Sequence, residues 1–193
     1  DSKRNMESSW KKVQKIHSLK NIGFEEYFMH IGRPFFDILS RIGIKRNYTK
    51  IKKTYEKESL RLEKQITNIS NVANTLTRLK SKNFILNIVT SKDIKRTKHF
   101  LNKLEKFFTL IECSNNKIKG KPHPDQINKI IYTLKAKKSE CVYIGDTNID
   151  YQTAKNSGID FIFAKWGYGI NYNYKYKIDN IKDLENSLKL TRN

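Results

Sequence analysis

The stretch Cys141-Val-Tyr-Ile-Gly-Asp-Thr-Asn-Ile-Asp150 decides the fold of this chain. It opens with a short apolar run of strand length that stops at Gly145, and a segment of helical character then runs to Gly158. In an open α/β sheet, ligands bind in the crevice outside the carboxyl ends of the strands. Two carboxylates at that edge suit a hard cation such as Mg²⁺. The stretch therefore predicts a metal site at Asp146 and Asp150.

The same alternation of strand and helix extends over residues 69–193. Besides the strand already described, at 140–145, strands are expected at 84–90, 107–111 and 160–164. Helices are expected around Val72, Leu76 and Leu79, at 94–104, at 124–134, between the aspartates and Ser157, and at 178–188. Strands that alternate with helices of this length indicate βα units and a parallel sheet. The prediction is an α/β fold with a Rossmann-like parallel core over residues 69–193.

Residues 1–68 differ from the rest of the chain, because their apolar residues follow a helical pattern and show no strand pattern. Helices are expected at 8–19, 24–31, 35–42 and 51–65. In the first of them, three-residue steps place Trp10, Val13, Ile16 and Leu19 on one face, and Ser8 or Ser9 is available as the cap. An all-helical domain is therefore predicted over residues 1–68.

The net charge of +20, from 39 basic and 19 acidic residues, invites a nucleic-acid function. The lysines are scattered through every predicted helix, however, and no RNP-like aromatic motif accompanies them, so no specific nucleic-acid partner is expected. No apolar run approaches 18 residues and no secretory signal is visible, so no membrane partner is expected. Cys113 and Cys141 resemble reduced core residues of a cytoplasmic protein.

Chemistry-bearing side chains lie at three places, two of them after predicted strands and one before a predicted helix. Thr90 and Ser91 end one strand, Lys121 stands before a helix, and Asp146 and Asp150 follow the opening strand. A hydroxyl beside helix-start amides holds phosphate oxygens, and a lysine supplies positive charge where phosphoryl charge develops. Aspartates hold Mg²⁺, which neutralises and orients the phosphate. This order is the equipment of a phosphoryl-transfer site.

Each of these residues also has a plainer interpretation. Thr90 alone could be a helix N-cap, Lys121 alone a solvated loop lysine, and the two aspartates turn and cap residues. Trp166 is expected to serve in packing. The joint order on suitable elements favours the functional interpretation, because independent coincidence is improbable.

These residues also carry a family resemblance. Asn87-Ile-Val-Thr-Ser91, Lys121-Pro-His-Pro-Asp125 and Gly145-Asp-Thr-Asn-Ile-Asp150 resemble the second, third and fourth motifs of the haloacid dehalogenase-like phosphatases. Trp166-Gly-Tyr-Gly169 resembles a loop of the phosphoglycolate phosphatase-like branch. Residues of roughly 7–66 match the helical cap that this branch inserts after its first motif.

The resemblance implies a Mg²⁺-dependent phosphomonoester hydrolase that acts on a small phosphorylated metabolite through an aspartyl-phosphate. Thr90 and Ser91 would bind the phosphoryl oxygens, and Lys121 would hold the phosphate and the nucleophile through its charge. Asp146 would ligate Mg²⁺, with Asp150 supporting the metal site or its waters. Arg33 would face the substrate from the cap, the alternative being a surface arginine. The resemblance names no particular metabolite and no oligomeric state.

The first motif of that family, Asp-x-Asp-Gly-Thr/Val, which supplies the nucleophilic aspartate, is not found in the sequence. Asp1-Ser2 resembles the continuation of that motif, so residues 1–6 are expected to be the tail of its loop. The first, central core strand is accordingly expected to be absent and the chain inactive as written. The alternative is a non-catalytic basic module that keeps the fold. A nucleotide-binding Rossmann protein is disfavoured, since no Gly-x-Gly-x-x-Gly follows a strand.

Overall fold

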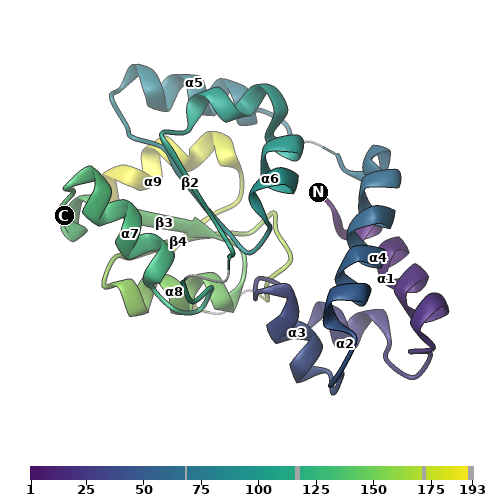
Figure 1. Ribbon diagram of the computed structural model, residues 1–193. Coiled ribbons are helices and arrows are strands. Elements are labelled where there is room, and N and C mark those ends of the chain that lie inside the picture. The colour runs from purple at the N-terminus through teal and green to yellow at the C-terminus, as the bar shows by residue number, and fades with distance from the viewer. Residues whose placement is uncertain (68, 116–117, 171–172, 191–193) are drawn as a thin grey trace. The chain divides into compact units, whose positions relative to one another are not determined.

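The computed structural model describes residues 1–67, 69–115, 118–170 and 173–190, and the chain divides into two compact units (Figure 1). One unit comprises Asp1–Ile31 and Phe35–Ser70, and the other comprises Gly32–Pro34 and Asn71–Asn193. The boundary predicted from the sequence falls at residue 68, which lies outside the described residues. The tripeptide Gly32–Pro34 thus belongs to a different unit from its neighbours on either side.

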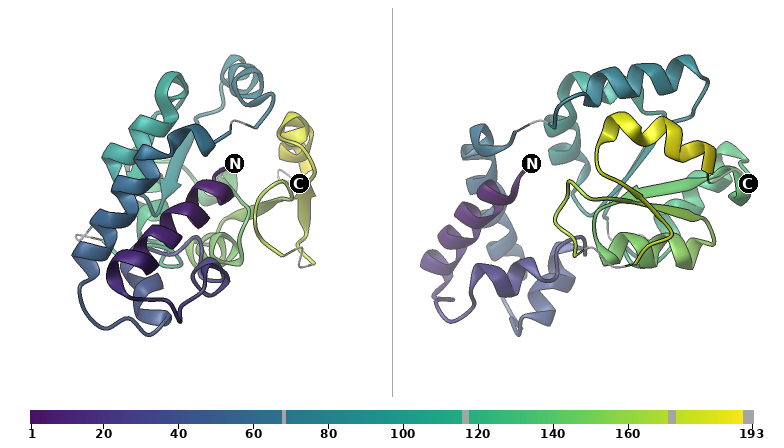
Figure 2. Two further views of the ribbon diagram at one scale, coloured as in Figure 1. Left: turned by 90° about the vertical axis from the view of Figure 1, so that its right-hand side faces the viewer. Right: turned by 180° about the vertical axis from the view of Figure 1, so that it is seen from behind.

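The first unit is helical throughout its described residues, and Figure 2 shows its helices from two further sides. Its elements are α1 (Lys3–His17), α2 (Phe24–Phe28), α3 (Phe35–Arg41), α4 (Tyr48–Arg61) and the 3₁₀-helix η1 (Glu63–Gln65).

A small aromatic and polar core holds these helices together. Trp10 and Tyr27 are buried and stack with their ring centroids 4.5 Å apart. The buried Asn5 side chain joins α1 to α4, because its amide donates to the Ser59 carbonyl at 2.9 Å and its oxygen accepts from the Ser59 hydroxyl at 2.7 Å. Buried amide and hydroxyl groups need such partners to offset their desolvation.

Helix α1 differs from its prediction at both ends. It begins at Lys3, so residues 3–6, expected in a loop, form its first turn. Ser9 does not cap it; the Ser9 hydroxyl donates to the Asn5 carbonyl at 2.7 Å within the helix. The helix ends at His17, where Ser18 takes a left-handed φ of 55°, and Ile16 is left 53% exposed instead of facing the core. Seryl side chains bond back to helix carbonyls as readily as they cap, which the pattern alone does not distinguish.

The second unit alternates strands and helices, as predicted. Its elements are α5 (Val72–Ser81), β1 (Asn87–Thr90), α6 (Ile94–Leu101), η2 (Asn102–Phe107), β2 (Leu110–Cys113), α7 (Asp125–Leu134), η3 (Lys138–Glu140), β3 (Val142–Gly145), α8 (Asn148–Ser157), β4 (Asp160–Ala164), β5 (Tyr176–Ile178), η4 (Ile181–Asp183) and α9 (Leu184–Leu190).

All strand pairs in this unit are parallel. Hydrogen bonds join β1 to β2, with Thr90 opposite Cys113, and join β3, β4 and β5 into a second ladder, with Gly145 opposite Phe163. Among the described residues no ladder joins β1 to β3. Parallel strands connected by helices confirm the α/β class that the alternation predicts.

Helices cover the strands on both sides. Figure 1 shows α5 and α9 on one side and α7 and α8 on the other. The side chains of β4 alternate between these layers, as the two-residue repeat of a strand requires. Ile162 packs with residues of α5, β5 and α9, whereas Phe161 and Phe163 pack with Ala154 of α8 and with Tyr174. Trp166 packs against the first of these clusters, so its predicted packing role is confirmed.

Three predicted boundaries in this unit are wrong. The strand expected to begin at residue 84 pairs only from Asn87. The strand expected at 107–111 is observed as β2 at Leu110–Cys113, because residues 102–107 form the 3₁₀-helix η2. The last helix was expected from Ile178, but Tyr176–Ile178 form β5 and the helix begins at Leu184. Ile178 is buried and pairs with Ala164, so tertiary pairing overrides the helical pattern there.

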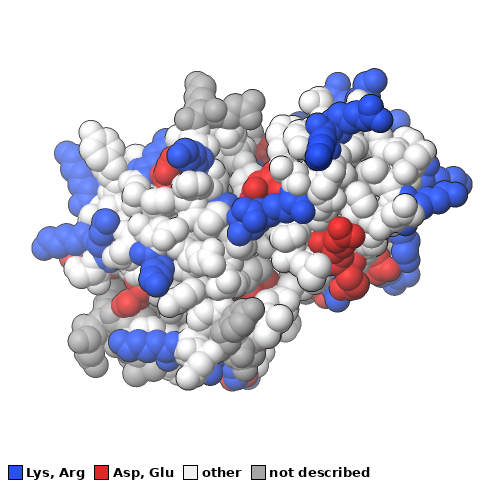
Figure 3. All heavy atoms as spheres, turned by 90° about the horizontal axis from the view of Figure 1, so that it is seen from below, with Lys and Arg blue, Asp and Glu red and all other residues white. Residues whose placement is uncertain are grey.

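The surface charge is dispersed. Figure 3 shows Lys and Arg side chains spread over one face with Asp and Glu among them. In the described part of the chain, no helix combines the length and apolar character needed to cross a membrane. Cys113 is buried, Cys141 is half-buried, and neither forms a disulfide.

Candidate active site

The carboxylate of Asp150 is the centre of the site, because both of its oxygens accept several hydrogen bonds. Its Oδ1 accepts from the Lys121 ammonium at 2.6 Å and from the Tyr143 hydroxyl at 3.1 Å. Its Oδ2 accepts from the Thr147 hydroxyl at 2.7 Å, the Thr147 amide at 3.1 Å and the Asp146 amide at 3.3 Å. Sequence positions far apart thus meet at one buried carboxylate.

Local structure explains why Asp150 points inward. Thr147 is the N-cap of α8, and its hydroxyl oxygen also lies 3.2 Å from the Asp150 amide, which completes a capping box with the Asp150 side chain. Gly145 permits the close approach, because a Cβ at this position would overlap the Asp150 side chain. The plainer expectation that Asp150 is a cap residue is therefore confirmed, and the same residue also pairs with Lys121.

The buried charges of this pair stabilise one another. Burial disfavours the Lys121 ammonium, but the nearby Asp150 carboxylate outweighs it, and the pKa of Lys121 is raised. Burial likewise opposes ionisation of Asp150, yet the charge and hydrogen bond of Lys121 hold the pKa of Asp150 below its usual value. Burial raises the pKa of Tyr143, so its hydroxyl stays neutral and serves as a donor.

Asp146 has a contrasting environment. Burial and the negative charge of Asp150 raise the pKa of Asp146, while the Tyr168 amide donates to its Oδ2 at 2.8 Å. Gly167 lets that loop wrap the carboxylate, because a Cβ there would overlap the Asp146 side chain. A half-buried carboxylate whose ionised form is disfavoured suits a bound cation, which would supply the missing positive charge.

The donor set for a cation is small. No cluster of three or more His, Cys, Asp or Glu side chains that could hold a metal ion occurs among the described residues. Asp150 is engaged by Lys121, and no basic group forms an ion pair with Asp146 in the described part of the chain. Asp146 is therefore the better of the two predicted metal ligands, and Asp150 fits a supporting position.

Thr90 stands at the end of β1, where several loops converge. Its carbonyl accepts from the Ser114 amide at 2.9 Å and from the Gln126 side-chain amide at 3.1 Å. The fully buried Gln126 also donates to the Glu112 carbonyl at 3.0 Å, so it links the ends of β1 and β2. Next to Thr90, the carbonyl oxygen of Val89 lies 3.4 Å from the Tyr143 hydroxyl, which brings β1 close to β3, although the single hydrogen of that hydroxyl is shared with the closer Asp150.

The plainer interpretation of Thr90 as a helix cap is wrong. The N-cap of α6 is Asp93, whose carboxylate accepts from the Arg96 amide at 3.0 Å. The Thr90 hydroxyl oxygen instead accepts from the Lys92 amide at 3.2 Å, within the loop after β1.

Arg33 is the middle residue of the tripeptide Gly32–Pro34, and Ser91 contacts this tripeptide. The Ser91 hydroxyl donates to the Gly32 carbonyl at 2.5 Å, so it is engaged by the protein itself. Pro34 packs against Gly120, just before Lys121, where a Cβ would come within 2.6 Å of the proline ring. Arg33 thus stands between two residues that contact the loops of the site.

Sequence reasoning missed three residues of this arrangement: Tyr143, Gln126 and Lys92. The sequence pattern predicts Tyr143 only as an apolar strand residue, and nothing in the sequence marks Gln126 as buried. Lys92 directly follows Thr90 and Ser91, so its place next to two predicted phosphate ligands was a usable signal.

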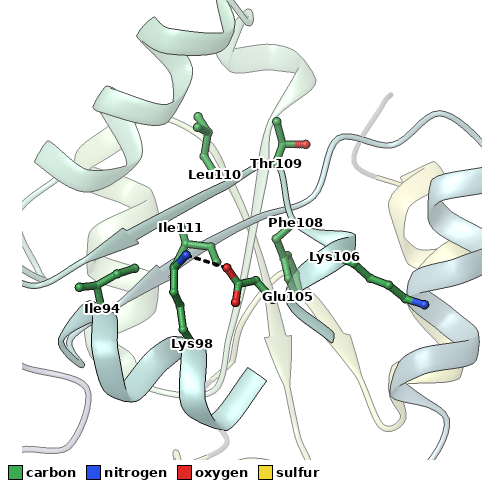
Figure 4. A pocket seen from close by; sticks show the side chains of 8 residues that line it. All are labelled: Ile94, Lys98, Glu105, Lys106, Phe108, Thr109, Leu110 and Ile111. Atoms are coloured by element: carbon green, nitrogen blue, oxygen red, sulfur yellow. Dashed lines mark ion pairs between the residues drawn. The ribbon is translucent and has the colours of Figure 1, made fainter. Parts of the chain in front are cut away.

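A pocket of about 600 Å³ lies elsewhere in this unit, between α6, η2 and the amino end of β2 (Figure 4). Lys98 and Glu105 face each other in it and form an ion pair of 2.8 Å, while Lys106 points away. None of the predicted site residues lines it. Leu110, which does line it, is the first residue of β2, whereas Cys113, which pairs with Thr90, is the last residue of that strand. The pocket is therefore separate from the site around Asp150.

Known proteins are similar to this chain in sequence and in fold. The sequence pattern described as haloacid dehalogenase-like hydrolase matches residues 1–164. A Caldanaerobacter subterraneus subsp. tengcongensis protein assigned as the pyrophosphatase PpaX is 30% identical over 148 residues, which are 75% of this chain and 67% of that protein. The pyrophosphatase PpaX of Oceanobacillus iheyensis is 24% identical over 95% of this chain and 89% of its own.

Among solved structures, a Bacteroides fragilis protein assigned as a haloacid dehalogenase-like hydrolase superposes with a TM-score of 0.83. It is 24% identical and the superposition covers 95% of this chain and 93% of that one. At this identity the likeness speaks for the fold, which agrees with the parallel strands and covering helices described above.

Proposed function

The chain belongs to the haloacid dehalogenase-like hydrolases, and from this premise we propose that it is a Mg²⁺-dependent phosphatase of small phosphorylated metabolites. Members of this family that resemble the chain are hydrolases and phosphatases, so an enzyme of this type is established. The choice of metal, the course of the reaction and the role of each residue are our proposals. The observation that carries them is the buried Lys121–Asp150 pair beside Asp146.

Lys121 would bind the phosphate through charge. Its ammonium is held in place by Asp150, so it pays little further entropy when an anion binds. The Thr90 hydroxyl, at the end of β1, would donate to a phosphoryl oxygen. Asp150 would act by fixing Lys121 and the turn at residues 145–147, because its own oxygens already accept from five donors.

Asp146 would ligate the Mg²⁺ ion, and Asp150 would support the metal site by holding the turn that carries Asp146. The raised pKa of Asp146 supports this placement, because a cation beside the carboxylate would favour its ionised form. The ion supplies charge neutralisation and orientation of the phosphate when bound.

The nucleophile would be an aspartate of an Asp-x-Asp-Gly sequence, which the 193 residues do not contain. It would attack phosphorus, form an aspartyl-phosphate and release the alcohol or phosphate, and water would then hydrolyse this acyl phosphate to inorganic phosphate and the free aspartate. Arg33 would contact the rest of the substrate, supported by its position between Gly32 and Pro34. The helical unit would be the cap of this site.

The substrate class stays broad. Two relatives carry the name pyrophosphatase, so diphosphate is a candidate beside sugar phosphates and phosphoglycolate. The alternative of a non-catalytic basic module is not favoured, because the matching family and the named relatives are hydrolases.

A chain extended at its N-terminus by a strand that carries Asp-x-Asp-Gly provides the test. With Mg²⁺ it should hydrolyse diphosphate or a phosphomonoester, and the activity should disappear on chelation by EDTA or in Asp146→Ala. Asp179→Ala, an exposed aspartate that pairs with Lys165, is the matched control and should keep the activity. If the extended chain with Mg²⁺ releases no phosphate from any of these substrates, the proposal is wrong.

A further inference from the structure

The loop after β1 presents Lys92 from a fixed backbone. The Lys92 amide donates to the Thr90 hydroxyl oxygen at 3.2 Å, and the Lys92 carbonyl accepts from the Ser114 amide at 3.2 Å. Both backbone groups of this residue are therefore held by protein. The side chain leaves the loop directly beside Thr90, the proposed phosphate ligand.

The charge of Lys92 differs from that of Lys121 in how it is balanced. Lys121 is buried and its ammonium contacts Asp150 at 2.6 Å, so its charge is largely neutralised within the protein. In the described part of the chain, no carboxylate forms an ion pair with Lys92. The positive charge that is not directly compensated next to Thr90 is therefore that of Lys92.

The ammonium of Lys92 lies within the electrostatic field of the site. Burial among protein atoms and the positive charges of Arg96 and Lys121 lower the pKa of Lys92 to about 8, while Asp146 and Asp93 oppose the shift. The residue as a whole is nevertheless exposed to solvent. An anion placed among these cations would stabilise the charged form of Lys92.

The neighbouring hydroxyl is less suited to the same task. Ser91 donates its hydroxyl hydrogen to the Gly32 carbonyl at 2.5 Å, and a hydroxyl has only one hydrogen to donate. Of the side chains of the two residues that follow Thr90, that of Lys92 still has hydrogens to donate to a ligand.

We propose that Lys92 is a further phosphate-binding residue of this site, which donates from its ammonium group to an oxygen of the substrate phosphate. The proposal rests on the proposed function, since it assumes that the phosphate binds between Thr90, Lys121 and Asp146. In this assignment, the loop after β1 contributes the Lys92 ammonium to phosphate binding as well as the Thr90 hydroxyl.

Titration of the full chain with inorganic phosphate, followed by calorimetry, tests this assignment. Lys92→Met should weaken phosphate binding about tenfold or more, because it removes a charged donor. Lys92→Arg should stay within about threefold of the original chain, since a guanidinium also donates to phosphate. Lys95→Met, which changes an exposed lysine of the following helix α6, is the matched control and should bind phosphate like the original chain.

The outcomes separate this inference from the proposed function. If phosphate does not bind, or binds equally well to Lys121→Met, the proposed site itself is wrong. If Lys121→Met weakens binding while Lys92→Met stays within about twofold of the original chain, only the assignment of Lys92 is overturned. Circular dichroism of each variant, which should match the original chain, guards against loss of binding through misfolding.

Discussion

The ammonium nitrogen of Lys121 lies 2.6 Å from Oδ1 of Asp150, and only 9% and 5% of these two side chains are exposed. A buried ion pair of this kind is costly to break, because the remaining partner is left charged and without compensation. The pair therefore fixes the Lys121 ammonium in place beside the turn that carries Asp146.

Asp150→Asn should lower the free energy of unfolding by about 3–5 kcal/mol, because it leaves the Lys121 ammonium buried without its counter-charge. Urea unfolding followed by circular dichroism measures the change. The control is Asp179→Asn, which breaks the Lys165–Asp179 pair of 2.8 Å, where the Asp179 side chain is 71% exposed. That pair should contribute less than about 1 kcal/mol. Equal losses in the two variants would contradict the special role of the buried pair.

The pH dependence of stability should carry the signature of Asp150. Burial opposes its ionisation, but Lys121 lowers the pKa of Asp150 below the value of an unfolded chain, about 3.9. The unfolded state then binds the proton more readily, so the stabilisation is present above about pH 4 and is lost as the pH falls through the folded pKa. Unfolding free energies measured between about pH 6 and pH 3 should decline more steeply for the original chain than for Asp150→Asn.

Gln126→Leu should destabilise the second unit by about 1–3 kcal/mol, because the Glu112 carbonyl loses a buried donor, whereas the Thr90 carbonyl loses the same donor but keeps the Ser114 amide. Gln14→Leu is the matched control in the first unit. Gln14 donates to the Ile22 carbonyl at 2.8 Å, but the Trp10 indole donates to the same oxygen at 3.0 Å, so that carbonyl keeps a partner. Thermal unfolding of both variants tests the difference, and a larger loss in Gln14→Leu would refute this account of Gln126.

Gly167→Ala should displace the loop that carries Tyr168, because the added methyl group would occupy the space of the Asp146 side chain. The cost should be about 1–3 kcal/mol, as for other overpacked sites, with loss of phosphate binding in the folded protein. Gly23→Ala is the control, since a Cβ there meets nothing within 4 Å. Calorimetric titration with phosphate and urea unfolding of both variants would show whether crowding at Asp146 matters.

The sequence predicts the α/β class and the neighbourhood of Lys121, Asp146 and Asp150 because both depend on local order. Each of these residues follows a strand or precedes a helix, and parallel topology brings such positions to one edge of the sheet. The prediction for β5 failed because a strand of three residues is stabilised by its partner β4 and by the burial of Ile178, which the local pattern does not contain.

Side chains that act over long sequence distances could not be predicted in the same way. Tyr143 reads as one apolar residue in a strand, and only the folded chain shows that its hydroxyl reaches Asp150 and Val89. Gln126 stands in an amphipathic helix like any polar residue, and its burial follows from the packing of α7 against β1 and β2. The absent first motif, the metal and the substrate role of Arg33 stay predictions.

The assignment of Gly32–Pro34 to the α/β unit has a consequence for how the protein can be divided. A single cut near residue 70 would separate residues 71–193 from this tripeptide, and Ser91 would lose the carbonyl to which it donates. The loop before Lys121 would also lose the proline that packs against Gly120. Neither piece would be a complete structural unit, so the two halves of the sequence are not interchangeable modules, and any hybrid made by swapping the helical part must carry a matching Gly32–Pro34 with it.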